Sequence, residues 1–203
     1  MDTRIPLGHP AAPQPPDPLT VQVRKGQAVA LAQALRPGYC QRWSVCPEMA
    51  GTEEHAAHAA RVARIILWAW PAAPAAALAW AITHDDGEMG LGDMSGVAKR
   101  RNPSLALLLD KAEARNRAEL GIEVPFLPPT HELICDLADK LAALYHVRQL
   151  RPGLLYEPQW QDDLIYLRRR FDATLARASD PVLRLRAAFE MDFQQWLEAA
   201  MEV

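Results

Sequence analysis

The chain has 203 residues and a formal net charge of −3, and half of its residues are apolar. This length suits one domain with a sizeable core. The acidic balance argues against a general nucleic-acid-binding protein, and no 18-residue stretch is free of both charge and proline, as a transmembrane helix would require. We therefore expect neither a nucleic-acid polymer nor a membrane as a partner. Three cysteines without metal-ligand spacing (Cys40, Cys46, Cys135) are typical of reduced thiols in a cytoplasmic protein.

The first 18 residues form a segment of their own. Five prolines lie between Pro10 and Pro18, and the charged residues Asp2 and Arg4 precede them without an apolar run, so the segment does not resemble a secretory leader. We expect residues 1–18 to form a disordered, proline-rich arm. We expect residues 19–203 to form a single helical domain.

Helical patterns dominate the remainder of the chain. Apolar residues recur at the 3.6-residue period of a helix, and no long alternating run of β-branched or aromatic residues predicts a strand. The expected helices span residues 21–35, 53–70, 75–84, 103–120, 131–150, 159–178 and 181–201. Pro37-Gly38 and Pro152-Gly153 end two of them, and four glycines between residues 86 and 96 predict a turn. The predicted fold class is therefore all-α.

Four polar residues stand out against this helical pattern. His84 and Asp85 end an apolar helix, where an unpartnered charge would be costly to bury. His55 lies on the apolar stripe of the 53–70 helix, and Asp139 lies on or beside the core face of the 131–150 helix. Two histidines and two aspartates from three helices suit one divalent cation: cobalt, manganese, zinc or magnesium. Such a site usually leaves coordination positions for water and a substrate oxygen.

The spacing leaves alternatives to two of these residues. His58 follows His55 by one turn on nearly the same face, and we interpret it as a decoy or a substrate contact. Glu132 and Asp136 lie within two turns before Asp139 and could ligate a metal by spacing alone. Of the two, Asp136 is the runner-up to Asp139.

A longer ordered set of motifs surrounds these residues. It consists of Arg42-Trp43, Glu54-His55, His84-Asp85, Glu88, Gly92-Asp93, Lys99 and Asp139. This set resembles the HD-domain phosphohydrolases, and among them the 5'-deoxynucleotidases and the related viral deoxynucleoside triphosphate (dATP) hydrolases. The resemblance covers residues 25–150 and is specific as a set, although each piece is ordinary. It implies a compact helical HD-domain bundle.

The resemblance also implies which residues bind the metal and move protons. The expected metal ligands are His55, His84, Asp85 and Asp139. Glu88 would be the general acid or base, and Asp93 a second catalytic carboxylate near the sugar or the scissile phosphate.

Three further residues are expected to bind the substrate. By the same resemblance, Arg42 and Lys99 would bind phosphate, while Trp43 would pack against a base or a sugar and favour a deoxyribose. The expected reaction is metal-dependent hydrolysis of a 2'-deoxynucleotide. Both a monophosphate and a triphosphate substrate remain open, as does the formation of a homo-oligomer, dimer or larger.

The sequence departs from the family pattern in one loop, and it also allows an alternative function. The family usually carries a proline in the loop before the lysine, and the segment between Asp93 and Lys99 has none. The alternative is a helical module whose metal is structural, or whose site binds a nucleotide without hydrolysing it. The presence of Arg42, Glu88, Asp93 and Lys99 beside the ligands argues against that alternative, because a structural site needs only the ligands.

Overall fold

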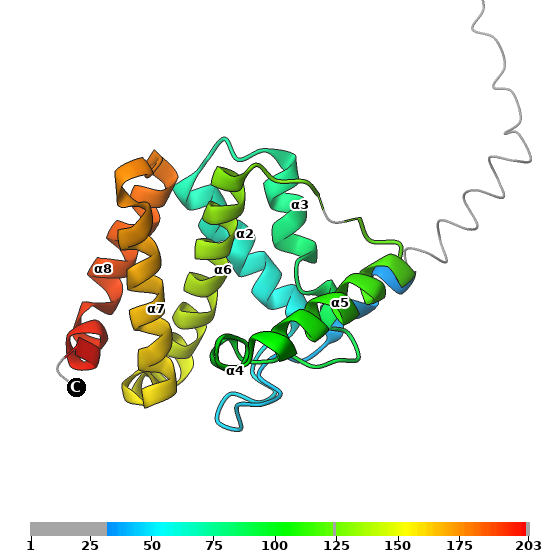
Figure 1. Cartoon of the computed structure of the whole chain (residues 1–203), viewed down its shortest axis with the longest axis horizontal. Helices are drawn as coiled ribbons and strands as arrows, with labels where there is room; N and C mark the ends of the chain where they lie inside the picture. Colours follow the sequence, from blue (N-terminus) through cyan, green and yellow to red (C-terminus); the bar gives the residue numbers. More distant parts are fainter. Residues whose placement is uncertain (1–31, 124, 202–203) are drawn as a thin grey trace, which may run out of the picture.

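The computed structural model describes residues 32–123 and 125–201 (Figure 1). The proline-rich arm expected over residues 1–18, the domain boundary expected at residue 19 and most of the helix expected over residues 21–35 lie outside the described residues. Within them the all-α prediction is confirmed. The described part is built of helices, and its only β-type pairing is an isolated bridge between Gln41 and Glu54.

The observed helices agree with the expected ones to within a few residues. The α-helices are α2 (His55–Ala69), α3 (Ala75–Thr83), α4 (Gly96–Arg101), α5 (Pro103–Glu119), α6 (Pro129–Leu150), α7 (Pro158–Thr174) and α8 (Asp180–Met201). Short 3-10 turns are η1 (Arg36–Tyr39), η2 (Asp86–Glu88), η3 (Pro152–Tyr156) and η4 (Leu175–Arg177). Prolines stand at the start of α5, α6 and α7, where their missing N–H costs no hydrogen bond. Helix α4 was not among the helices expected from the sequence.

The central element of the bundle is α6, which is packed on two sides (Figure 1). Leu137, Leu141 and Leu144 join the core cluster that includes side chains of α7 and α8. Ala138 and Ala142 join a second cluster with side chains of α2 and α3, where small residues allow the backbones to approach closely. A carboxylate at the next position, Asp139, is consequently held at the boundary between α6 and these two helices.

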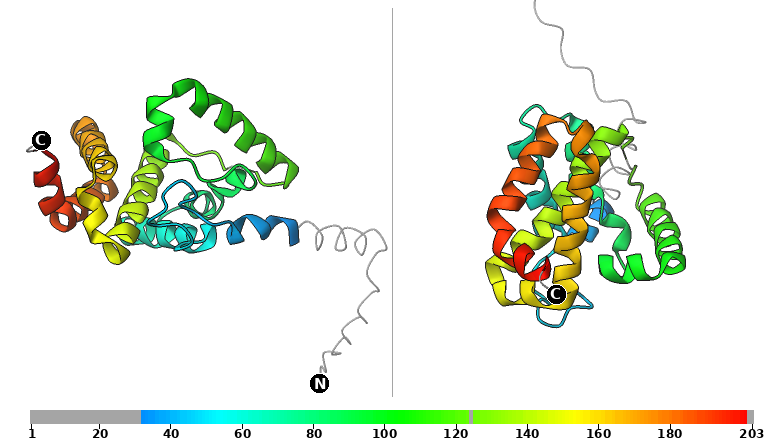
Figure 2. Two further views of the ribbon diagram at one scale, coloured as in Figure 1. Left: turned by 90° about the horizontal axis from the view of Figure 1, so that it is seen from below. Right: turned by 60° about the vertical axis from the view of Figure 1, so that its left-hand side comes forward.

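The helices α4 and α5 lie beside this bundle rather than inside it (Figure 2). No residue of α5 with a described side chain is buried, yet α5 packs closely on η2. Asn116 donates hydrogen bonds to the carbonyl oxygens of Gly87 and Met89, both at 2.9 Å. A Cβ at Gly87 would lie 2.7 Å from the carbonyl oxygen of Glu113, so only glycine fits this approach. In this way α5 fixes the turn that follows His84-Asp85.

Candidate metal centre and pocket

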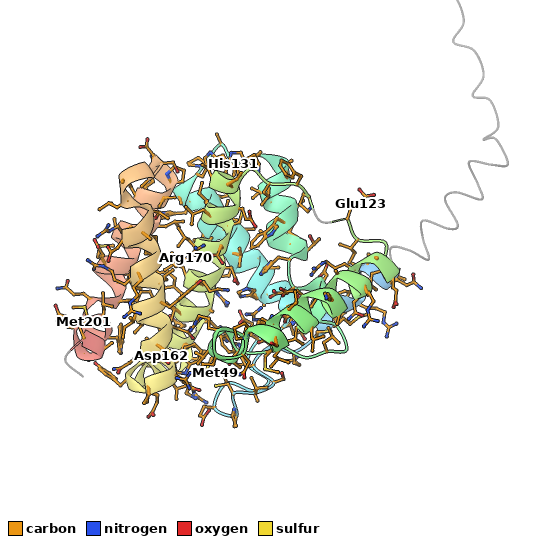
Figure 3. The ribbon with its side chains drawn as sticks, viewed as in Figure 1. Met49, Glu123, His131, Asp162, Arg170 and Met201 are labelled. Atoms are coloured by element: carbon orange, nitrogen blue, oxygen red, sulfur yellow. The ribbon has the colours of Figure 1, made fainter. Side chains whose placement is uncertain are left out.

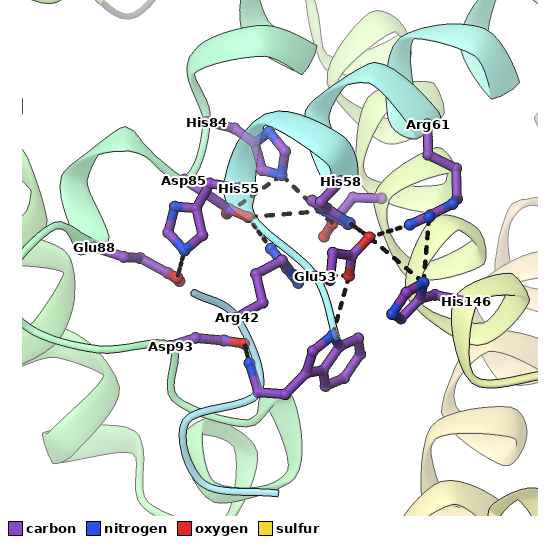
Figure 4. Close-up of polar contacts among 12 residues, drawn as sticks. Arg42, Glu53, His55, His58, Arg61, His84, Asp85, Glu88, Asp93 and His146 are labelled. Atoms are coloured by element: carbon purple, nitrogen blue, oxygen red, sulfur yellow. Dashed lines mark hydrogen bonds and ion pairs between the residues drawn. The ribbon is translucent and has the colours of Figure 1, made fainter. Parts of the chain in front are cut away.

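The polar residues around the candidate site, both the predicted ones and the unpredicted His58 and Glu53, come from four separate segments. His55 and His58 lie on α2, and Asp139 lies on α6. His84 ends α3 and Asp85 leads into η2. Arg42, Trp43 and Glu53 belong to the loop before α2, and the close-up in Figure 4 shows side chains from these segments meeting in one cluster.

Two imidazoles and one carboxylate converge on one point, and the carboxylate of Asp85 lies beside both imidazoles. Nε2 of His58 lies 2.8 Å from Oδ1 of Asp139 and 3.8 Å from Oδ2 of Asp85. Nε2 of His84 lies 3.3 Å from Oδ1 of Asp85 and 3.5 Å from Oδ1 of Asp139. Ligand atoms of His58, His84 and Asp139 all lie within 4.8 Å of one another. This donor set suits a divalent transition metal.

The surroundings of His84 fit a metal ligand. Its Nδ1 lies 3.1 Å from the carbonyl oxygen of Ala81, which favours the tautomer with the proton on Nδ1 and leaves Nε2 free to bind. Nε2 is buried and makes no hydrogen bond. Trp80 stacks on the ring at 4.5 Å and 12°. Burial opposes protonation, but Asp85 and Asp139 raise the pKa of His84 to about 9, so the two carboxylates attract positive charge to this point.

The structure brings His58, rather than His55, together with the other three predicted ligands. Nε2 of His55 faces Oε2 of Glu88 at 3.7 Å. The physical reason is the register of α2. His58, Val62 and Ile66 recur every four residues, are fully buried and face α6, whereas His55 is the first residue of the helix and lies nearer to η2. In the sequence, His55 belongs to an equally regular series with Ala59, Val62 and Ile66, so helical spacing did not separate the two histidines.

Asp136, the alternative ligand, forms an ion pair with Arg170 of α7 instead of joining the cluster. Its Oδ2 accepts a hydrogen bond from Arg170 at 2.8 Å, and Arg170 lies between α7 and α6 in Figure 3. Asp139 instead contacts His58, and the Nζ of Lys140 lies 2.6 Å from its second oxygen. The choice of Asp139 over Asp136 therefore agrees with the geometry.

Arg42 is buried next to the candidate ligands. Its guanidinium is hydrogen-bonded to Asp85, and its Nε lies 3.5 Å from Oε2 of Glu53. Burial works against the charged form, but the carboxylates of Asp85 and Asp93 raise the pKa of Arg42 above its ordinary value. A permanent positive charge therefore stands directly beside the candidate metal centre.

The two predicted catalytic carboxylates lie on the same side of the cluster. Burial raises the pKa of Glu88 to about 9, with Asp85 and Asp93 acting in the same direction. Nζ of Lys99 lies 3.7 Å from Oε1 of Glu88. Oδ2 of Asp93 accepts a hydrogen bond from the backbone N–H of Trp43 at 2.9 Å. This bond joins the loop after η2 to the loop before α2.

The side chain of Trp43 is buried and lines the pocket. Its indole stacks on His146 at 6.0 Å and 7°, lies 5.5 Å from the ring of Trp160, and donates from Nε1 to Glu53 at 3.1 Å. Its backbone has a φ of 65°, a left-handed conformation that is uncommon for a residue with a side chain. The contacts to Asp93 and Glu53 hold it there.

A pocket of ≈ 230 Å³ opens over these residues. Part of its lining is charged, namely Arg42, Asp85, Glu88, Asp93, Lys99, Arg100, Asp139, Lys140 and Asp163. Another part is apolar or aromatic, including Trp43, Val45, Ala143, Leu144, Trp160 and Tyr166. A cavity of this size and composition suits one small ligand with an anionic part and an apolar or aromatic part.

Several residues of the site were absent from the predicted set. Glu53 and Lys140 contact predicted site residues directly. Arg61 and His146 lie behind the cluster and contact Glu53 and each other. A charged residue in a loop, such as Glu53, carries no periodic signal, so only its burial marks it.

Comparisons of the chain with family models, curated proteins and solved structures give no match. None of the described helices is long and apolar enough to cross a bilayer.

Proposed function

We propose that this chain is a metal-dependent phosphohydrolase of the HD type that acts on 2'-deoxynucleotides. One observation carries the proposal. His58, His84 and Asp139 meet at one point, with Asp85 beside the two histidines. The adjoining pocket is also lined by Arg42, Lys99, Glu88 and Asp93. Cation ligands, phosphate-binding cations and proton-carrying carboxylates are the three sets of groups that such a reaction needs.

The metal ion would be held by His58, His84, Asp85 and Asp139, in place of the predicted set that contained His55. When bound in such a site, a divalent cation lowers the pKa of a coordinated water and polarises a phosphoryl oxygen. The mixed nitrogen and oxygen donors are compatible with cobalt, manganese, zinc or magnesium.

The remaining side chains would bind the phosphate and move the proton. The planar guanidinium of Arg42 can pair with two phosphate oxygens, and Lys99 can neutralise the charge that develops on them. Hydrolysis forms a bond from water oxygen to phosphorus and breaks the bond from phosphorus to the sugar O5'. Glu88, a buried carboxyl with a pKa raised to about 9, is suited to deliver a proton to that leaving oxygen.

The substrate class follows from the pocket and from the motifs. A volume of ≈ 230 Å³ is small for a ligand pocket and favours a ligand no larger than a single nucleotide. The aromatic lining residues Trp43, Trp160 and Tyr166 suit a base and a sugar without a 2'-hydroxyl, in keeping with the resemblance to deoxynucleotidases. A monophosphate would yield nucleoside and phosphate, and a triphosphate would yield nucleoside and triphosphate.

A substrate panel tests the proposal. The full chain is incubated with manganese, cobalt, zinc or magnesium and with matched deoxy- and ribonucleotide mono- and triphosphates, and the products are resolved by chromatography. We expect metal-dependent turnover of deoxynucleotides that is lost in His58→Ala and Asp139→Ala. Stoichiometric metal without turnover of any nucleotide would overturn the catalytic assignment and favour the non-catalytic module.

A further inference from the structure

Glu53 is a fully buried carboxylate directly behind the candidate metal centre. Its side chain has no exposed surface, and it lies two residues before α2 begins. Its backbone oxygen accepts a hydrogen bond from the N–H of Arg42 at 2.9 Å. Burying a charge is costly unless partners surround it, so the contacts of this carboxylate indicate its role.

Glu53 reaches two residues of the proposed site at once. Its Oε1 lies 3.9 Å from Nδ1 of His58, and its Oε2 lies 3.5 Å from Nε of Arg42. Nδ1 of His58 is buried and makes no hydrogen bond, while Nε2 of the same ring points to Asp139. The carboxylate therefore faces the ring nitrogen of His58 that the metal would not use.

A second layer of side chains holds Glu53 from behind (Figure 4). Arg61 donates a hydrogen bond to its Oε1, and the indole Nε1 of Trp43 donates to its Oε2 at 3.1 Å. Arg61 also lies 3.2 Å from Nδ1 of His146, whose Nε2 lies 3.1 Å from Oγ1 of Thr52. These contacts come from three segments of the chain and leave the carboxylate little freedom to turn away.

We propose that Glu53 is a positioning residue. It orients the His58 ring toward the metal ion and the Arg42 guanidinium toward the phosphate. A carboxylate beside Nδ1 of a histidine keeps the proton there and leaves the Nε2 lone pair for the metal. The same carboxylate lies 3.5 Å from Nε of Arg42. Its charge would keep the guanidinium in place when the other nitrogens leave Asp85 for a phosphate. The proposal rests on the proposed function, because it assumes that His58 binds the metal and Arg42 the phosphate.

The test compares Glu53→Gln with a matched control. Gln keeps the shape of the side chain and removes its charge, and Glu54→Gln makes the same change at the neighbouring, exposed position. Cobalt or manganese affinity is measured on the full chain by competition with a chromogenic chelator, together with kcat and KM. We expect Glu53→Gln to weaken metal affinity by about 10–100-fold, the usual effect of losing such a partner, and to raise KM. The control should stay within about twofold of the wild type, and Glu53→Asp should recover part of the affinity because it restores the charge.

The outcomes separate this inference from the proposed function. A wild-type chain that binds no metal overturns both. A wild-type chain that binds metal and turns over nucleotide, with Glu53→Gln unchanged in metal affinity, overturns the inference alone. If Glu53→Gln does not fold, nitrogen-15 NMR of the zinc-loaded wild type decides instead. The inference requires the proton of His58 on Nδ1, and a proton on Nε2 overturns it.

Discussion

Nε2 of His58 and Oδ1 of Asp139 lie 2.8 Å apart, although 81 residues separate them in the chain. This contact joins α2 to α6. His84 and Asp85, at the end of α3, contact the same two side chains. It determines which of the two α2 histidines belongs to the cluster. Substituting each of the two histidines in turn therefore tests which one binds the metal.

Replacing each histidine separately should give different losses. We expect His58→Ala to lose bound metal and activity together, because it removes one of the four proposed ligands. His55→Ala should keep about one metal ion per chain, since the imidazole of His55 faces Glu88 instead. Metal content by mass spectrometry and a cobalt absorbance titration measure both. The reverse result, with metal lost only in His55→Ala, would restore His55 as the ligand.

Glu88→Gln should separate activity from metal binding. If Glu88 carries the proton, turnover should fall by about 10²–10⁴-fold while metal content stays at the wild-type level. The experiment pairs nucleotide turnover with metal analysis of the same sample. Loss of metal along with activity would instead make Glu88 a ligand.

The same substitution should stabilise the metal-free protein at high pH. The pKa of Glu88 is raised from 4.5 to about 9 in the folded protein, mainly by burial. A carboxyl with a raised pKa contributes stability that is fully present below its unfolded pKa and is lost as the pH rises through its folded pKa. The amide that replaces the carboxyl does not ionise, so the melting temperature of Glu88→Gln minus that of the wild type should increase from pH 5 to pH 9 in chelator. A difference that shrinks over this range would contradict the burial of an ionisable Glu88.

Trp43 should matter for stability as well as for sugar choice. Trp43→Ala removes the ring that stacks on His146, and we expect a loss of about 3–5 kcal/mol in the free energy of unfolding. Trp43→Phe keeps a ring but removes the donor to Glu53, and should cost about 1–3 kcal/mol. Urea unfolding measures both losses. Wild-type stability in either variant would mean that the indole does not occupy the buried position described above.

The sugar preference is measured on the wild type and on Trp43→Phe. A 2'-hydroxyl pressed against the apolar wall loses water without gaining a partner, at a cost of about 1–3 kcal/mol. This corresponds to roughly a ten- to hundredfold preference for deoxynucleotides, and Trp43→Phe should keep most of it. Equal wild-type rates on matched deoxy- and ribonucleotides would refute the deoxynucleotide assignment and leave the phosphohydrolase assignment intact.

Gly87→Ala should disturb the site through α5. The added methyl group would lie 2.7 Å from the backbone oxygen of Glu113, so the turn or the helix must move. We expect a loss of about 1–3 kcal/mol from this overpacking, together with reduced activity because His84, Asp85 and Glu88 adjoin the turn. Gly153→Ala is the matched control, since its methyl group meets no atom within 4 Å. Thermal unfolding should show no loss for the control, and equal behaviour of the two variants would contradict the close approach of α5.

The helices could be predicted because their signals are local. Apolar residues at helical spacing, the Pro-Gly pairs at Pro37-Gly38 and Pro152-Gly153, and glycines in the segment after α3 act within a few residues of the chain. The all-α class followed from these signals. The arrival of His84-Asp85 at the end of an apolar helix also indicated a polar cluster, because such residues need partners in a buried setting.

Tertiary structure decided the composition of the cluster. His55 and His58 lie one turn apart on one helix, and the sequence alone contains no distance from either to Asp139. The packing of α2 against α6 and α3 places His58 at the meeting point and directs His55 to Glu88. Glu53 could not be recognised from local pattern, because the importance of a loop carboxylate appears only when the folded chain surrounds it with Arg42, Arg61 and His146. Helix formation depends on near neighbours, whereas a metal site depends on distances between helices that only the packed core sets.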